Sequence, residues 1–341
     1  MTATRILWLS LMVACGGPVA DAPKPATTPA PALTGERNAE GKLKGGPKGP
    51  PQVKPMGPPA PQVDPALLAQ LRAMGAEGKA AIERCMAGVH PQLLAWKQGM
   101  PMGFDQAALD AACADVAAVH DRHEAALLPH FRSAHRALNA LARVAEDARV
   151  IGIYLAHPER KETMATAVEH LKASLPEELA GIQEAVKQDA AEADMLVFPE
   201  RQVDHAALVT ELKRMVSNDE TDLGNLVETF TNYAWAQRES HEMVRTRMLM
   251  HFGRWATALV ASHRGELASL RPTDPADQAV IDAIGRYLDT ANTLATVYMS
   301  GAQGFVDGTV APGEADARLE AVKEAFETWQ LARQAALASL G

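Results

Sequence analysis

Four histidines lie between positions 120 and 135, two of them beside a carboxylate. His120, His123 and Glu124 are three and four residues apart, a spacing that places side chains on one face of a helix. Two imidazoles and a carboxylate form a donor set that transition metals accept. In a helical bundle, further ligands would come from a second helix. The best candidates are His241, Glu242 and His251. The alternative is that these histidines are solvated side chains on an alanine-rich helix.

The short signatures of common enzyme classes are missing. The segment His241 to Arg245 matches a zinc-protease helix only in part, because Arg245 stands where the second histidine ligand is needed. The sequence has no Gly-x-Ser-x-Gly elbow, no P-loop and no glycine-rich dinucleotide turn. We therefore predict a protein that is not an enzyme and that needs no cofactor.

Aromatic side chains recur where the core of a helical protein would need them. Phe230 and Tyr233 are three residues apart, whereas Trp235 faces another side of the same helix. Core filling is therefore favoured over a groove in which these rings bind a ligand. The same prediction covers Trp255, Phe326 and Trp329, and the methionines Met243, Met248 and Met250.

The first residues have the form of an export signal. Arg5 precedes the apolar run Ile6 to Ala14, which is too short to span a bilayer. The sequence Val13-Ala14-Cys15-Gly16 resembles the lipobox of bacterial lipoproteins, although Met12 stands where leucine is usual. We predict residues 1–14 as a signal peptide and Cys15 as the lipidation site. An ordinary signal peptide that contains a cysteine is the alternative.

A tether is expected to follow the lipid. Several acyl chains on one residue bind a membrane stably, and Gly16 favours sorting to the outer membrane. Residues 16–64 contain twelve prolines and no apolar period, so we predict residues 15–64 as a disordered, partly polyproline tether. Residues 1–64 carry a net charge of +3, which leaves −12 on residues 65–341. An acidic domain of this kind is not expected to bind nucleic acid.

Two cysteines remain when Cys15 is set aside. Disulfides form in exported proteins, so we predict a bond between Cys85 and Cys113. It would close a loop of about thirty residues and add on the order of 3 kcal/mol to stability. The alternative is two separate cysteines that are buried as small apolar side chains.

Helical periodicity runs through residues 65–341, which we predict as one all-α domain. Asp64 and Pro65 have the form of an N-cap and a first helical residue, and Pro91 should break or kink this helix. Asp105 should cap a second helix of roughly fifty residues, on the order of 75 Å long, with Pro129 as its kink. Helices of this length predict an elongated antiparallel bundle.

Local stop and start signals divide the rest of the chain. We expect no strands. The further predicted helices cover residues 159–173, 176–193, 204–215, 222–270, 273–299 and 314–340.

These features together resemble a known family. The lipobox, the proline-rich tether, Cys85 and Cys113 on consecutive helices with Trp96 between them, and the stretch from Tyr154 to His170 are similar to the YiiG-like helical lipoproteins. That bacterial family is defined by a domain of unknown function. A second aromatic residue that the family often carries near Tyr154 is missing here. The resemblance implies a helical fold and an envelope address, but no activity.

The sequence therefore favours a lipid-anchored protein of the cell envelope that serves as a structural or protein-interaction module. We expect it in the outer membrane, facing the periplasm or the cell surface. Its partners would be the membrane, through its acyl chains, and cell-wall or envelope proteins. The alternative is a periplasmic lipoprotein that binds a small ligand or a metal through His120, His123 and Glu124.

Overall fold

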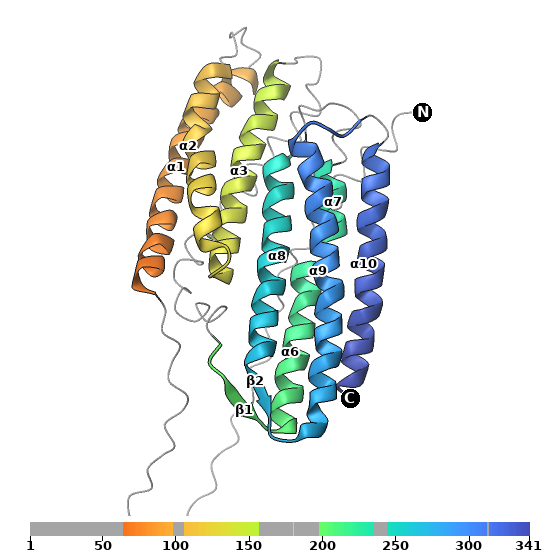
Figure 1. Cartoon of the computed structure of the whole chain (residues 1–341). Helices are drawn as coiled ribbons and strands as arrows, with labels where there is room; N and C mark the ends of the chain where they lie inside the picture. The colour runs from red at the N-terminus through yellow and green to blue at the C-terminus, as the bar shows by residue number, and fades with distance from the viewer. Residues whose placement is uncertain (1–63, 98–105, 157–179, 181–197, 235–243, 312–313) are drawn as a thin grey trace, which may run out of the picture. The chain divides into compact units, whose positions relative to one another are not determined.

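The computed structural model describes residues 64–97, 106–156, 180, 198–234, 244–311 and 314–341 (Figure 1). This part of the chain is all-α, as predicted, apart from two strands of three residues. Residues 1–63, which include the predicted signal peptide and all of the predicted tether except Asp64, lie outside the described residues. So do the helices predicted over 159–173 and 176–193, except for Ala180. None of the described helices is long and apolar enough to cross a membrane.

Helix α1 spans Pro65–Lys97 and begins where the sequence predicts. The Asp64 carboxylate accepts a hydrogen bond of 2.8 Å from the backbone N–H of Ala66, and Pro65 occupies the first helical position. The helix continues through Pro91 to Lys97. The break that Pro91 could have caused is therefore absent.

The predicted helix of roughly fifty residues is in fact two helices, α2 (Gln106–Leu127) and α3 (Arg132–Ala156). The chain turns at Pro129, which lacks an N–H and cannot continue the helical ladder. In this turn the N–H of Phe131 donates to the Leu127 carbonyl over 3.1 Å. Helices α1, α2 and α3 consequently run antiparallel to their neighbours, side by side (Figure 1).

The prediction of a single helix from Asp222 to Leu270 is also wrong. Helix α6 (His205–Leu223) begins after the predicted cap Asp204, whose carboxylate accepts from the N–H of Ala207 over 2.8 Å, but continues past Met215 to Leu223. After Gly224 the chain forms α7 (Leu226–Ala234), and α8 covers Thr246–Ser269. Leu223 at the end of α6 and Leu226 at the start of α7 are both buried. The helical spacing of apolar residues therefore continues across the turn.

The last helices agree with their predicted starts. The carboxylate of Asp274 accepts from the N–H of Ala276 over 2.9 Å and caps a short 3₁₀ turn, η6 (Pro275–Asp277), which leads into α9 (Gln278–Val306). Helix α9 ends seven residues later than predicted. Helix α10 spans Glu314–Ser339 and packs against α9, which packs against α8 (Figure 1).

Two short strands depart from the prediction of none. Strand β1 (Arg201–Val203) pairs in parallel with β2 (Leu270–Pro272), and Arg201 lies opposite Leu270. Three residues are too few to show the alternating pattern by which a strand is recognised. The pairing joins the chain just before α6 to the chain just after α8.

The predicted core residues pack inside the bundle. Phe230, Trp255 and Trp329 are at most 1 % exposed, and Tyr233 and Phe326 are half-buried against the core. Met248 and Met250 are also buried. Trp235 and Met243 lie outside the described residues.

Candidate metal centre

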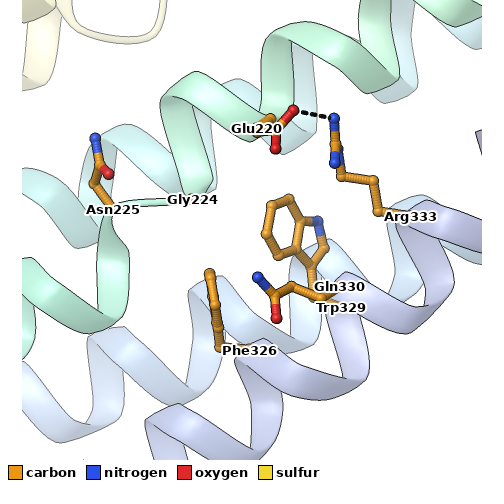
Figure 2. A pocket seen from close by; sticks show the side chains of 7 residues that line it. All are labelled: Glu220, Gly224, Asn225, Phe326, Trp329, Gln330 and Arg333. Carbon is orange, nitrogen blue, oxygen red and sulfur yellow. Dashed lines mark hydrogen bonds and ion pairs between the residues drawn. The ribbon is translucent and has the colours of Figure 1, made fainter.

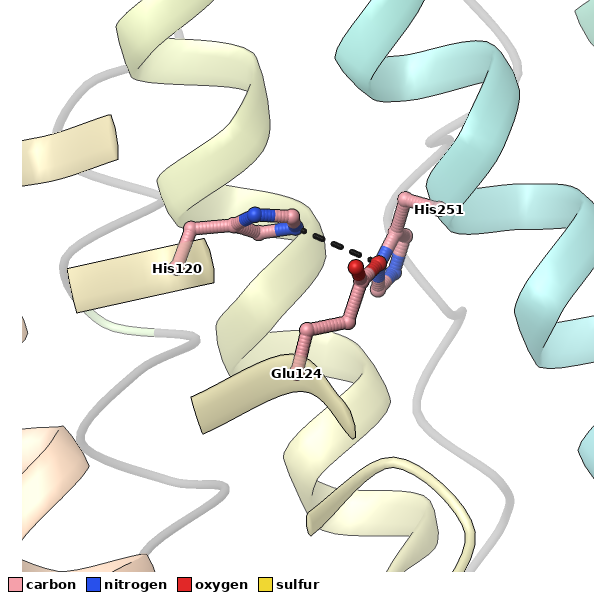
Figure 3. Close-up of side chains that lie close together, drawn as sticks. All are labelled: His120, Glu124 and His251. Atoms are coloured by element: carbon pink, nitrogen blue, oxygen red, sulfur yellow. Dashed lines mark hydrogen bonds and ion pairs between the residues drawn. The ribbon is translucent and has the colours of Figure 1, made fainter. Parts of the chain in front are cut away.

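Three buried side chains converge between two helices (Figure 3). His120 and Glu124 come from α2, and His251 comes from α8. Each offers one possible ligand atom, and these atoms all lie within 4.8 Å of one another. The three residues are 0 to 2 % exposed. A cluster of polar groups this far from solvent requires partners for its donors and acceptors.

One oxygen of the Glu124 carboxylate lies at the middle of the cluster. Oε1 is 3.0 Å from Nδ1 of His251 and 3.5 Å from Nε2 of His120. This Nε2 is buried and makes no hydrogen bond to any described residue. A buried polar atom without a partner costs about 1–3 kcal/mol. The atom therefore lies where a further group could bind.

Each imidazole is oriented through its other ring nitrogen. Nδ1 of His120 lies 2.8 Å from Oδ1 of Asp121, and Nε2 of His251 lies 3.0 Å from Nδ1 of His135. Metal-binding histidines in proteins are usually held in this way, by a hydrogen bond on the nitrogen that does not bind the metal. When His120 donates its Nδ1 proton to Asp121, the lone pair lies on Nε2, toward Glu124.

Further contacts fix the charge of the cluster. Arg254 forms an ion pair with the second oxygen of Glu124. Burial acts to raise the pKa of Glu124, but the hydrogen bond with His251 and the nearby positive charges bring it below its ordinary value. Burial lowers the pKa of His251, although Glu124 opposes this shift. An ionised carboxylate and a neutral imidazole are the forms that bind metals.

His135 extends the cluster into α3. Its ring stacks on His251 and on Trp255, with centroid distances of 5.0 and 4.3 Å. Burial, followed by the charge of His251, holds the pKa of His135 well below its ordinary range. A neutral His135 can accept a hydrogen bond at Nδ1 from Nε2 of His251. In that tautomer Nδ1 of His251 carries a lone pair, which could bind a metal in place of its hydrogen bond with Glu124.

His123 does not join the other two predicted ligands. Its Nε2 lies 3.3 Å from Oε2 of Glu77 on α1, and the same oxygen accepts from Arg122 over 2.7 Å. Consecutive helical residues point about 100° apart, so His123 faces α1 while Glu124 faces α8. The alternative of solvated histidines is wrong as well, because His120 and His123 are 1 % and 8 % exposed.

Of the ligands expected from a second helix, His251 lies in the cluster. His241 and Glu242 lie outside the described residues. Asp121, His135 and Arg254 are the members that sequence reasoning missed. These residues join the cluster because helices that are distant in the chain pack together. No residue spacing in the sequence indicates that packing.

The predicted disulfide is present. Cys85 on α1 and Cys113 on α2 form a disulfide, 28 residues apart in the chain. It fixes α2, the helix that carries His120 and Glu124, to α1.

A separate hollow of about 250 Å³ is lined by residues of α6, of the turn that follows it and of α10 (Figure 2). Glu220 and Arg333 form an ion pair across it at 2.6 Å, and the buried ring of Trp329 lies beneath them. Nε1 of Trp329 donates to the hydroxyl of Tyr287 over 3.3 Å. The charged groups of this hollow thus already have protein partners.

Comparison of the chain with protein-family models, with curated proteins and with solved structures finds no significant match. The resemblance to the YiiG-like lipoproteins stays a prediction.

Proposed function

We propose that this chain is a lipid-anchored protein of the bacterial cell envelope whose helical domain binds a divalent transition metal, with Zn²⁺ the best fit. The ligands are His120, Glu124 and His251. The observation that carries the proposal is the buried Nε2 of His120, which has no hydrogen-bond partner among the described residues and lies beside two further donors.

The donor set and its spacing support Zn²⁺. Zinc binds imidazole nitrogens and carboxylate oxygens at about 2.0–2.2 Å, so neighbouring ligand atoms in a tetrahedral site lie about 3.3 Å apart. Two separations in the cluster are 3.0 and 3.5 Å, close to that value. The third pair of ligand atoms also lies within 4.8 Å.

Burial favours binding over catalysis. A catalytic zinc keeps an open coordination position for water or substrate. Here all three donors are almost fully enclosed, and Arg254 already pairs with the second oxygen of Glu124. We therefore propose a structural role for the enclosed metal.

The envelope address rests on the apolar run Ile6 to Ala14, the lipobox at Cys15 and the proline-rich segment that follows. The bond between Cys85 and Cys113 supports it, because disulfides persist in oxidising, exported compartments. In this compartment the helical domain would act as a metal-stabilised module at the end of its tether, with envelope proteins as partners.

Calorimetric titration of the full chain tests the metal site. The protein is stripped with a chelator and titrated with Zn²⁺ alone, and bound zinc is then measured by elemental analysis. We expect one equivalent for the wild type and for His123→Ala, the matched control on the same helix. His120→Gln and His251→Gln should each bind at least about tenfold more weakly, the effect expected when a metal site is disturbed.

Circular dichroism of each variant shows whether its helices are intact, so that weak binding is not mistaken for unfolding. The proposal is wrong if the folded wild type takes up no stoichiometric zinc. It is also wrong if His123→Ala weakens binding as much as His251→Gln does.

A further inference from the structure

The candidate metal centre lies between two groups of helices. The first group is α1, α2 and α3, and the second is α6 to α10. His120 and Glu124 belong to the first group and His251 to the second (Figure 3). A metal bound here would be coordinated from both groups at once.

The two groups meet through charged side chains of opposite sign. Carboxylates on α2 and α3 face arginines at and near the start of α8. The pairs are Asp121 with Arg247 at 3.1 Å, Asp147 with Arg245 at 2.6 Å, and Glu124 with Arg254. Glu146 adds a hydrogen bond of 2.9 Å from the backbone N–H of Arg247. These polar contacts supplement apolar packing, because the buried core is one cluster that includes residues of both groups.

The first group is also held together by a covalent bond, because Cys85 and Cys113 link α1 to α2. Across the interface, the His135 ring stacks on Trp255 and on His251, and Arg132 on α3 forms an ion pair with Asp222 on α6. Ion pairs open to solvent contribute about 0–1 kcal/mol each and weaken with salt. Asp121 and Arg254 are about half exposed, at 57 % and 50 % of their side chains.

We infer that the metal acts as a clamp that fastens α2 to α8 and so governs whether the two helix groups stay joined. The inference rests on the proposed metal site. Without metal, separation exposes apolar surface and breaks ion pairs, of which the solvent-exposed ones are screened by salt. With metal, separation also requires His120 and Glu124 to release the ion, or His251 to do so.

Hydrogen exchange read by mass spectrometry tests the clamp on the full chain. Exchange is measured with chelator, and again with free Zn²⁺ at 100 times the Kd found by titration. Openings that release the metal should become about 100-fold rarer, so amides of α2, α3 and α8 at the interface slow by that factor. Amides of α10 should be unchanged. In chelator, raising NaCl from about 0.1 to about 1 M should speed exchange at the interface, and Zn²⁺ should suppress this effect.

A pair of variants separates the interface from general stability. Arg245→Gln removes the partner of Asp147 without touching a proposed ligand. It should speed exchange at the interface of the metal-free chain, and Zn²⁺ should restore the slow rate. Arg264→Gln removes an exposed ion pair between α8 and α9 and should leave the interface unchanged.

The outcomes are distinct. Zinc that binds but slows exchange equally in α10, or leaves the salt effect intact, overturns the clamp while the metal site stands. A chain that takes up no zinc overturns the metal site itself, and the clamp with it. Zinc protection confined to α2, α3 and α8 supports both.

Discussion

Two buried tyrosines on α9 differ in the partners of their hydroxyl groups. The hydroxyl of Tyr287 donates to Asp219 over 2.5 Å and accepts from Trp329. The hydroxyl of Tyr298 makes no hydrogen bond to any described residue. Burial raises the pKa of both above the ordinary value, helped in Tyr287 by the charge of Asp219. Both hydroxyls therefore stay protonated, and their contributions to stability depend on those partners.

The same substitution at the two positions should have unequal results. Tyr287→Phe leaves buried polar atoms of Asp219 and Trp329 without a partner, and should cost about 1–3 kcal/mol of unfolding free energy. Tyr298→Phe removes an unsatisfied hydroxyl and should be neutral or slightly stabilising. Urea unfolding followed by circular dichroism measures both. Equal losses in the two variants would contradict this assignment of hydrogen bonds.

The residues of the metal centre could be predicted in part. The spacing of His120 and Glu124 indicates a shared helical face, and His251 stands out as a ligand type on another helix. The sequence does not reveal which neighbouring helix covers which side of α2. His123 was therefore grouped with them, although it contacts Glu77 on α1. The supporting role of His135 depends on α3 packing beside α8 and has no local signal.

Helix starts were more predictable than helix ends. Asp64, Asp204 and Asp274 each accept a hydrogen bond from a backbone N–H within three residues, so the signal lies wholly in the local sequence. The sequence predicts only a kink at Pro129 and no turn at Gly224, because apolar residues keep helical spacing on both sides of them. Whether such a chain continues straight or reverses depends on tertiary packing.

Helices α1 and α2 approach each other closely at Gly88. A Cβ atom added there would lie 2.5 Å from the Cβ of Ala112, closer than two carbon atoms can pack. Gly285 lies within α9 and has nothing within 4 Å of such an atom. At Gly88 there is no space for a side chain, whereas at Gly285 there is space and only the conformational freedom of the backbone would change.

Alanine at these positions should change stability in opposite directions. Gly88→Ala should force the two helices apart and lower stability by about 1–3 kcal/mol. Gly285→Ala should raise it by about 0.5–1 kcal/mol, because alanine favours the helix. Thermal unfolding gives the Tm of each variant. A Tm for Gly88→Ala at or above that of the wild type would mean that α1 and α2 do not pack this closely.

At the scale of the whole molecule, the proposed anchor determines where the chain is found in the cell. Cys15→Ala should move the protein from the membrane fraction to the soluble fraction of an expressing bacterium, because several acyl chains are needed for stable attachment. Met12→Leu, which brings the lipobox closer to its usual form, should leave the protein in the membrane fraction. Detergent-phase partitioning measures both. Cys15→Ala protein that stays in the detergent phase would argue against lipidation at Cys15.

Strands β1 and β2 join parts of the chain that are far apart in sequence, since Arg201 pairs with Leu270. The antiparallel pairs α1–α2, α8–α9 and α9–α10, in contrast, are formed by consecutive segments, whose closure costs less chain entropy. Parallel strands also need a crossover, here supplied by α6, α7 and α8. We therefore expect the strands to pair only after these helices have packed, so that this end of the bundle forms late in folding.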